Sequence, residues 1–143
     1  MAKELWVEKY RPKTVSEYVF KNASQRKQVE QWVQDGSIPH LLFSGSAGTG
    51  KTTLAKVLIN DLDVQSADVL YINASRDNNV DTMRQKITAF CETMPWGEFK
   101  VVLLDEADYM TPNAHLYDTV PSYHARLPVR WASYNPPRPV TQP

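Results

Sequence analysis

Short apolar runs alternate with amphipathic segments along most of the chain. Three runs have the length and the continuous apolar character of buried strands, at residues 40–43, 69–72 and 101–104. Helices are predicted before and between them, over residues 24–35, 53–60 and 80–90. Strands that alternate with helices are typical of βαβ units. The pattern therefore predicts an α/β fold, in which a parallel sheet carries helices on both faces.

The ends of these segments carry boundary signals. The helix over 24–35 is expected to end at Gly36, and the helix over 80–90 is expected to begin at an N-cap, either Asn79 or Asp77. Residues 1–22 are mixed in character and predict an irregular arm rather than a helix or strand. Residues 112–143 hold seven of the ten prolines and show no helical period.

Composition narrows the class of protein. The 143 residues are enough for one domain with a core but too few for two full-sized domains. Sixteen basic and sixteen acidic side chains cancel, so any DNA contact must come from a local patch. The single Cys91 excludes an intrachain disulfide framework and a multi-cysteine zinc site. The sequence contains neither a secretory signal nor a membrane-spanning run, and we expect a cytoplasmic protein.

A glycine-rich segment follows the first predicted strand. Residues 45–52 read GSAGTGKT and match the P-loop pattern G-x-x-x-x-G-K-[ST] at every fixed position. The glycines let successive N–H groups turn inward, and the helix that starts here adds its positive dipole end, so an anion site forms. Lys51 is expected to reach the β- and γ-phosphates, and the Thr52 hydroxyl to ligate Mg²⁺. The candidate nucleotide-binding residues are Gly45, Ser46, Ala47, Gly48, Thr49, Gly50, Lys51, Thr52 and Thr53.

The alternative is a glycine-rich turn that matches the pattern by accident. Average residue frequencies predict a chance match in roughly one chain of this length in two hundred. The context, with an apolar strand before the loop and a helix after it, also favours the functional interpretation. We therefore predict a P-loop ATPase that binds ATP and Mg²⁺.

An acidic pair follows the third predicted strand. Asp105 and Glu106 are placed at the carboxyl edge of a parallel sheet, where ligands bind. Asp105 is the candidate Mg²⁺ ligand, and Glu106 is the candidate base that polarises the attacking water. We expect their strand to lie beside the P-loop strand. Without the P-loop, the pair would be read as an ordinary strand end about as readily.

Four segments resemble one family. They are WVEKYRP at 6–12, IPHLLFSGSAGTGKTTLAK at 38–56, INAS at 72–75 and VVLLDEAD at 101–108. Together they resemble the small subunits of replication factor C and the ATPase subunits of bacteriophage clamp loaders, both of the AAA+ class. The similarity covers residues 5–114, approximately, and WVEKYRP is its most specific part.

The resemblance implies an AAA+ ATPase domain that is followed, in the family, by a helical lid and a collar. Family subunits form a ring around a primer–template junction and open a sliding clamp. The implied partners are therefore a sliding clamp, primer–template DNA and neighbouring subunits that supply an arginine finger. The expected location is the cytoplasm (the host's for a phage protein) or the nucleus of a eukaryote. The finger, lid and collar match no residue of this sequence, so we expect weak nucleotide binding and impaired ring assembly.

The resemblance also implies roles for single residues. Those expected beside the adenine and ribose are Glu8, Tyr10, Arg11 and Pro12. A surface turn is the alternative for this segment. Asn73 matches a polar residue that hydrogen-bonds the catalytic glutamate in the inactive state, which makes it a candidate switch for Glu106. The alternative for Asn73 is a strand-end asparagine that closes a turn.

A DNA-facing patch is implied on the helix over 80–90. Arg84 matches a basic residue that faces the DNA backbone in the family, and Lys86 and Arg76 are candidates to extend the patch. A solvated helix face is the alternative. The turn RDNN at 76–79 departs from the acidic and glycine residues of the family, which leaves the DNA-proximal turn in doubt.

A second departure lies near the C-terminus. Residues 115–128 hold two prolines where the family has a helix, yet residues 130–134 again resemble its next strand, and Asn135 its sensor asparagine. A compensated frame error or a rewritten segment explains both observations, and predicts poor order over 115–128. The expected layout is an arm at 1–22, an ATPase domain at 23–135 that is incomplete at its C-terminus, and a proline-rich tail at 136–143.

Three functions stay open. The first is ATP hydrolysis coupled to clamp opening, with Lys51, Glu106 and Asn135 at the reacting phosphate. The second is a nucleotide-binding module without turnover. The third is another AAA+ protein, such as a Holliday-junction motor or a replication initiator, against which the WVEKYRP segment weighs.

Overall fold

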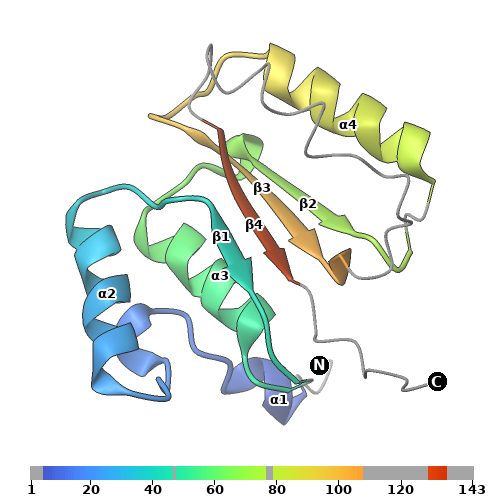
Figure 1. Cartoon of the computed structure of the whole chain (residues 1–143). Helices are drawn as coiled ribbons and strands as arrows, with labels where there is room; N and C mark the ends of the chain where they lie inside the picture. Colours follow the sequence, from blue (N-terminus) through green and yellow to red (C-terminus); the bar gives the residue numbers. More distant parts are fainter. Residues whose placement is uncertain (1–4, 47, 77–78, 108–128, 135–143) are drawn as a thin grey trace, which may run out of the picture.

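The computed structural model describes residues 5–46, 48–76, 79–107 and 129–134. At its centre lies a parallel sheet with the strand order β1-β4-β3-β2 (Figure 1). The strands are β1 (Leu41–Phe43), β2 (Val69–Asn73), β3 (Lys100–Asp105) and β4 (Val129–Tyr134). The predicted parallel α/β architecture is confirmed, including the strand that returns after residue 128.

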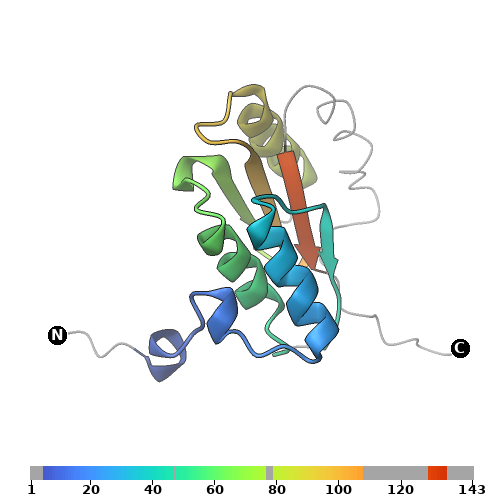
Figure 2. The ribbon, with the colours of Figure 1, turned by 90° about the vertical axis from the view of Figure 1, so that its left-hand side faces the viewer.

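Helices cover both faces of the sheet, as predicted (Figures 1 and 2). α2 (Ala23–Gln34) and α3 (Lys51–Asp61) lie on one face, and α4 (Val80–Glu92) lies on the other. The buried side chains on the α2 and α3 face include Val15, Val29, Ile38, Val57, Leu58, Phe99 and Val101. Those on the α4 face include Ile72, Met83, Ile87, Cys91, Val102 and Leu104.

β3 is buried on both of its faces. Val101 packs towards α3, and the next residue, Val102, packs towards α4. Successive side chains of a strand point to opposite faces, so a strand covered on both sides reads as a continuous apolar run. Each such buried side chain stabilises the fold by about 1.5–3 kcal/mol.

Asparagine side chains begin two of the helices. Asn22 and Asn79 each accept hydrogen bonds from backbone N–H groups in the first turn, of α2 and α4 respectively, at 2.8 to 3.2 Å. These N–H groups have no partner within the helix, which is why an asparagine stabilises the start. Asn79 is thus the cap of α4; the other candidate, Asp77, lies outside the described residues. Gly36, with φ 66°, follows the end of α2 as predicted.

The prediction of an irregular arm over residues 1–22 is wrong for the described part of the arm. It contains a one-turn helix α1 (Trp6–Lys9) and a 3-10 helix η1 (Val15–Glu17). A single turn holds too few residues to display a helical period, so patterning missed both elements.

The arm is docked on α3 by hydrogen bonds. The backbone N–H of Val15 donates to Asp61 Oδ2 at 2.7 Å, and Asn60 Nδ2 donates to the Lys13 carbonyl at 2.8 Å. Val15 itself is buried among core residues. The helix that follows the P-loop therefore also positions the arm.

The strand order corrects one expectation, because β3 does not lie beside β1. β4 lies between them: Ala132 pairs in register with Leu41 on one side and with Leu103 on the other. Spacing along the chain does not reveal this, since a crossover connection can leave room for a strand that arrives later.

Some predictions concern residues outside the described part of the chain. These are Ala47 of the P-loop, the sensor candidate Asn135, the segment 115–128 and the tail 136–143. Of the helices that are described, none combines the length and the apolar character needed to cross a membrane.

Candidate nucleotide-binding site

The P-loop joins the end of β1 to the start of α3 (Figure 1). Three of its glycines have positive φ angles: Gly45 at 149°, Gly48 at 75° and Gly50 at 84°. Residues other than glycine rarely adopt such backbone conformations. α3 begins at Lys51, so the first turn of the helix and its positive dipole end face the loop. The loop has the backbone of an anion-binding turn.

Gly50 is in the tightest place in the loop. A Cβ atom at this position would lie 2.8 Å from Tyr18 Oη. The same hydroxyl donates to the carbonyl oxygens of Gly50 at 3.2 Å and Thr49 at 3.5 Å. Tyr18 therefore connects the arm to the P-loop. Sequence analysis missed it, because a lone aromatic residue in an arm carries no motif.

We predict that Gly50→Ala lowers the free energy of unfolding by about 2–3 kcal/mol, measured by chemical denaturation. A left-handed conformation costs an L-residue roughly 1–2 kcal/mol, and the forced contact with Tyr18 adds about 1 kcal/mol or more. Gly36→Ala is the matched control, because Gly36 has φ 66° but no atom within 4 Å of the added Cβ. Equal losses in the two variants would contradict a steric role for Tyr18.

Lys51 lies over the loop that precedes it. Its Nζ donates to the Gly45 carbonyl and to Thr49 Oγ1, both at 3.0 Å, and also to the Ser46 carbonyl. The Thr49 hydroxyl in turn donates to the Ser46 carbonyl at 2.9 Å. The ammonium group is therefore held at the mouth of the loop, where a phosphate would be bound.

The Asp105 carboxylate reaches the start of α3. Thr52 Oγ1 donates to it, at 3.0 Å from Oδ1 and 3.2 Å from Oδ2, although the two residues are 53 positions apart. Both side chains are half-buried, as is the next residue, Thr53. The fold therefore brings together the two residues that the sequence predicts as Mg²⁺ ligands, even though β4 separates β3 from the P-loop strand β1.

These groups fit magnesium. A hydroxyl and a carboxylate are hard oxygen ligands, and Mg²⁺ in phosphate-binding sites takes one or two protein groups together with phosphate and water. Among the residues that the structure describes, no group of three or more His, Cys, Asp or Glu side chains could hold a metal. A dedicated protein cage for another metal is accordingly not found there, and the Thr52–Asp105 pair is the candidate.

Tyr71 on β2 also contacts Asp105, which sequence reasoning missed. Its hydroxyl donates to Asp105 Oδ2 at 2.8 Å. Burial first, and then the hydrogen bond and negative charge of Asp105, raise the pKa of Tyr71, while a hydrogen bond from Asn73 lowers it. Tyr71 lies in an apolar run of a strand, so no motif marked it.

Glu106 has an unusual backbone. It follows β3 directly with φ 54°, in the left-handed region, and its N–H donates to Asp105 Oδ1 at 3.1 Å. A glutamate with positive φ is uncommon, and such conformations concentrate at functional sites. The structure thus places Glu106 in a turn at the carboxyl edge of the sheet, next to the candidate metal ligand.

Asn73 ends β2 and pairs in register with Asp105. Its Oδ1 accepts hydrogen bonds from Ser75, from the backbone N at 3.0 Å and from Oγ at 2.6 Å. This is the turn-closing role named as the alternative for Asn73. A switch role towards Glu106 would use the amide nitrogen, and it stays a prediction.

Three of the four arm residues expected at the nucleoside share one cavity. Glu8, Arg11 and Pro12 line a cavity of about 380 Å³ between the arm and α3. Glu8 and Arg11 form an ion pair at 3.3 Å. Tyr10 is not among the residues that line the cavity; its ring packs edge-on against Trp6, with the centroids 6.2 Å apart, and is 70% exposed.

The three DNA-contact candidates differ in exposure. Arg84 is half-buried on α4, and within the described part of the chain its Nε is buried without a hydrogen-bond partner. Lys86 and Arg76 are exposed. Arg84 and Lys86 are two positions apart, which places them on different sides of a helix. A contact with DNA stays a prediction for each residue singly.

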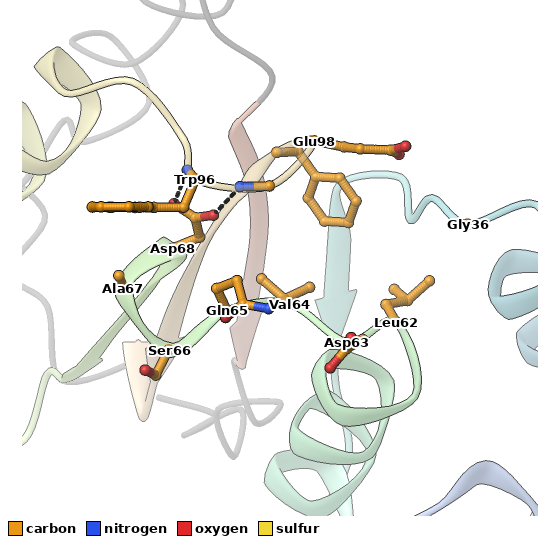
Figure 3. Close-up of a pocket in the computed structure, with 12 residues that line it drawn as sticks. Gly36, Leu62, Asp63, Val64, Gln65, Ser66, Ala67, Asp68, Trp96 and Glu98 are labelled. Atoms are coloured by element: carbon orange, nitrogen blue, oxygen red, sulfur yellow. Dashed lines mark hydrogen bonds between the residues drawn. The ribbon is translucent and has the colours of Figure 1, made fainter.

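A larger cavity, of about 450 Å³, lies at the opposite edge of the sheet from the P-loop (Figure 3). Its lining comes from Gly36 and from the segments that precede β2 and β3. The buried Asp68 carboxylate anchors one side, accepting from the backbone N–H groups of Trp96 at 2.9 Å and Gly97 at 2.7 Å. None of the predicted site residues lines this cavity, so it is separate from the nucleotide site.

Two relatives of the chain share a name. A "Replication factor C small subunit" from Thermofilum pendens is 44% identical over 118 residues, which are 80% of this chain and 36% of the relative. The protein of the same name from Saccharolobus solfataricus is 45% identical over 117 residues, 77% of this chain and 34% of the relative. The chain therefore spans about a third of the length of these relatives.

Solved structures agree in fold. Thermotoga maritima RuvB (T158V) superposes with a TM-score of 0.65 at 20% identity, over 88% of this chain and 42% of that chain. C. elegans PCH-2 superposes with a TM-score of 0.61 at 18% identity, over 91% of this chain and 42% of that chain. At this level of identity the likeness concerns the fold alone.

A family model covers most of the described core. The model for the "ATPase family associated with various cellular activities (AAA)" matches residues 41–126, from β1 through the P-loop, α3, β2, α4 and β3. This is more than half of the chain, and it contains both the loop and the carboxylate that the loop contacts. The chain belongs to the AAA ATPase family.

Proposed function

We propose that this chain is the ATP-binding and ATP-hydrolysing part of a DNA sliding-clamp loader subunit, which opens the clamp and loads it at primer–template junctions. The contact between Thr52 and Asp105 carries the nucleotide part of the proposal, because it joins the phosphate loop to a carboxylate in one site. The clamp-loader part is supported by the relatives named replication factor C small subunit.

The loop, Lys51, Thr52 and Asp105 have separate tasks in this proposal. Backbone N–H groups of the loop and of the first turn of α3 bind the phosphates. Lys51 Nζ exchanges loop carbonyls for the β- and γ-phosphate oxygens. Thr52 and Asp105 would supply the protein's oxygen ligands to Mg²⁺. The metal, when bound, neutralises charge on the phosphate oxygens.

Hydrolysis requires a prepared water molecule. Glu106 orients and polarises it as general base, and Asn135 contacts it or the γ-phosphate. Asn73 restrains Glu106 in the inactive state. An arginine from a neighbouring subunit completes the site, and such a residue is typically worth about 10³–10⁵ in rate. The chain alone is therefore expected to turn over very slowly.

The remaining predicted residues face the nucleoside and the DNA. Glu8, Tyr10, Arg11 and Pro12 hold the adenine and ribose through the docked arm. Arg84, Lys86 and Arg76 contact the DNA backbone, which makes binding sensitive to salt and insensitive to base sequence. These partners place the protein where DNA is replicated, in the cytoplasm or, in a eukaryote, in the nucleus.

Retention of a sliding clamp tests the proposal. The full-length protein, assembled with its partner subunits and immobilised, is incubated with the sliding clamp from the same genome, with and without ATP and Mg²⁺. We expect ATP-dependent retention of the clamp, and its loss in Lys51→Ala. A protein that binds ATP but never retains the clamp would assign the site to another AAA+ machine.

A further inference from the structure

The Asp105 carboxylate is held by three donors from three different segments. Thr52 Oγ1 from α3 lies between its two oxygens, at 3.0 and 3.2 Å. The N–H of Glu106 donates to Oδ1 at 3.1 Å, and the Tyr71 hydroxyl from β2 donates to Oδ2 at 2.8 Å. Tyr71 makes the shortest of these contacts.

The position of Tyr71 follows from the register of the sheet. Asn73 pairs with Asp105, and Tyr71 pairs with Leu103 two residues earlier, so Tyr71 is the diagonal neighbour of Asp105. Residues two apart on a strand share a face, and the long ring of tyrosine spans the diagonal. Ile72 between them is buried on the other face, against α4.

Helix α3 contacts the ring of Tyr71 as well as the Asp105 carboxylate. Thr52 and Lys56 are four residues apart and share one side of the helix. Lys56 Nζ lies 5.6 Å from the centroid of the Tyr71 ring. Lys56 therefore lies over the ring, and 45% of Tyr71 stays exposed. The Tyr71 hydroxyl, in contrast, donates a hydrogen bond to the Asp105 carboxylate.

When a carboxylate binds Mg²⁺ through one oxygen, a hydrogen bond to its other oxygen keeps the ligand in the orientation that the metal requires. If Oδ1 faces the metal beside Thr52, then Oδ2 is the oxygen that Tyr71 holds. A hydrogen bond of this kind orients the ligand and removes the rotational freedom that metal binding would otherwise have to freeze. We propose that Tyr71 is a positioning residue, whose hydroxyl fixes the Asp105 carboxylate for Mg²⁺; this rests on the proposed nucleotide site.

The test is Tyr71→Phe, which keeps the ring and its contact with Lys56 and removes only the hydroxyl. A fluorescent ATP analogue is titrated at a series of Mg²⁺ concentrations and in EDTA. We expect the Mg²⁺ concentration for half of the metal-dependent gain in affinity to rise by about 10- to 100-fold. Binding in EDTA should be unchanged, because the loop and Lys51 are intact. Mn²⁺ in place of Mg²⁺ gives the same comparison by electron paramagnetic resonance.

Ser66→Ala is the control, because it removes an exposed hydroxyl from the segment before β2, which lies at the opposite edge of the sheet from the P-loop. Its Mg²⁺ midpoint should not move. In an Asp105→Asn background, Tyr71→Phe should add little, since the two residues act on one ligand. Thermal unfolding of each variant confirms that it is folded at the assay temperature.

Failure of the role of Tyr71 and failure of the proposed nucleotide site give different results. An unchanged Mg²⁺ midpoint in Tyr71→Phe, or an equal rise in Ser66→Ala, overturns the role of Tyr71 and leaves the nucleotide site standing. If the unsubstituted protein binds no nucleotide with or without Mg²⁺, the proposed function fails and the role of Tyr71 fails with it.

Discussion

Glu106→Gln is expected to lower ATP turnover by about 10²–10⁴-fold while leaving nucleotide binding nearly unchanged. Glutamine has the same size and shape as glutamate, but it cannot accept a proton from the attacking water. The backbone at this position already has φ 54° with a non-glycine residue, and the substitution leaves that turn as it is. Phosphate release should be measured in the full-length protein assembled with its partner subunits, because the proposed arginine finger comes from a neighbour.

Glu98→Gln is the control for this substitution. Glu98 is exposed and lies before β3, at the opposite edge of the sheet from the P-loop. It should leave turnover unchanged. If Glu106→Gln is as active as the unsubstituted protein, Glu106 is not the general base, and another group must prepare the water.

Lys51→Ala is expected to weaken ATP binding by at least about 100-fold. The side chain would contribute two or more charge-assisted hydrogen bonds to phosphate oxygens, each worth roughly 1.5–3 kcal/mol, and every 1.4 kcal/mol is a factor of ten in affinity. In the structure the ammonium group already lies at the loop, on the Gly45 and Ser46 carbonyls. Little reorganisation is therefore needed when phosphate binds.

Isothermal titration calorimetry with ATP and Mg²⁺ measures this loss. Lys27→Ala, on the exposed side of α2, is the matched control and should bind as the unsubstituted protein does. Loss of affinity by the same factor in EDTA would separate Lys51 from the metal, because its contact with phosphate does not pass through Asp105. Unchanged affinity would contradict a phosphate site at this loop.

Local patterning accounted for most of the elements. Val29 in α2, and Met83 and Ile87 in α4, belong to apolar patterns with helical spacing, and all three are buried in the described structure. α2 and α4 were therefore predictable. β3 was predictable as well, because a strand covered on both faces needs apolar side chains at every position. The elements of the arm were not, since one turn such as Trp6–Lys9 has no measurable period.

In the candidate site, too, some residues were predictable from the sequence and others were not. Lys51, Thr52 and Asp105 carry a motif or follow a strand, and the fold brings them within hydrogen-bond distance of one another or of the loop. Tyr18 and Tyr71 carry no motif, although each donates a hydrogen bond to the site. Their contribution comes from where the arm and β2 are placed.

By itself the sequence determined the identity of the phosphate loop and the class of fold, because both depend on local backbone conformation and on the spacing of apolar residues. Only the tertiary structure decided that β4 separates β1 from β3, and that Tyr71 reaches the Asp105 carboxylate. Strand order and diagonal contacts are set by pairing between residues far apart in the chain, and no local pattern encodes that pairing.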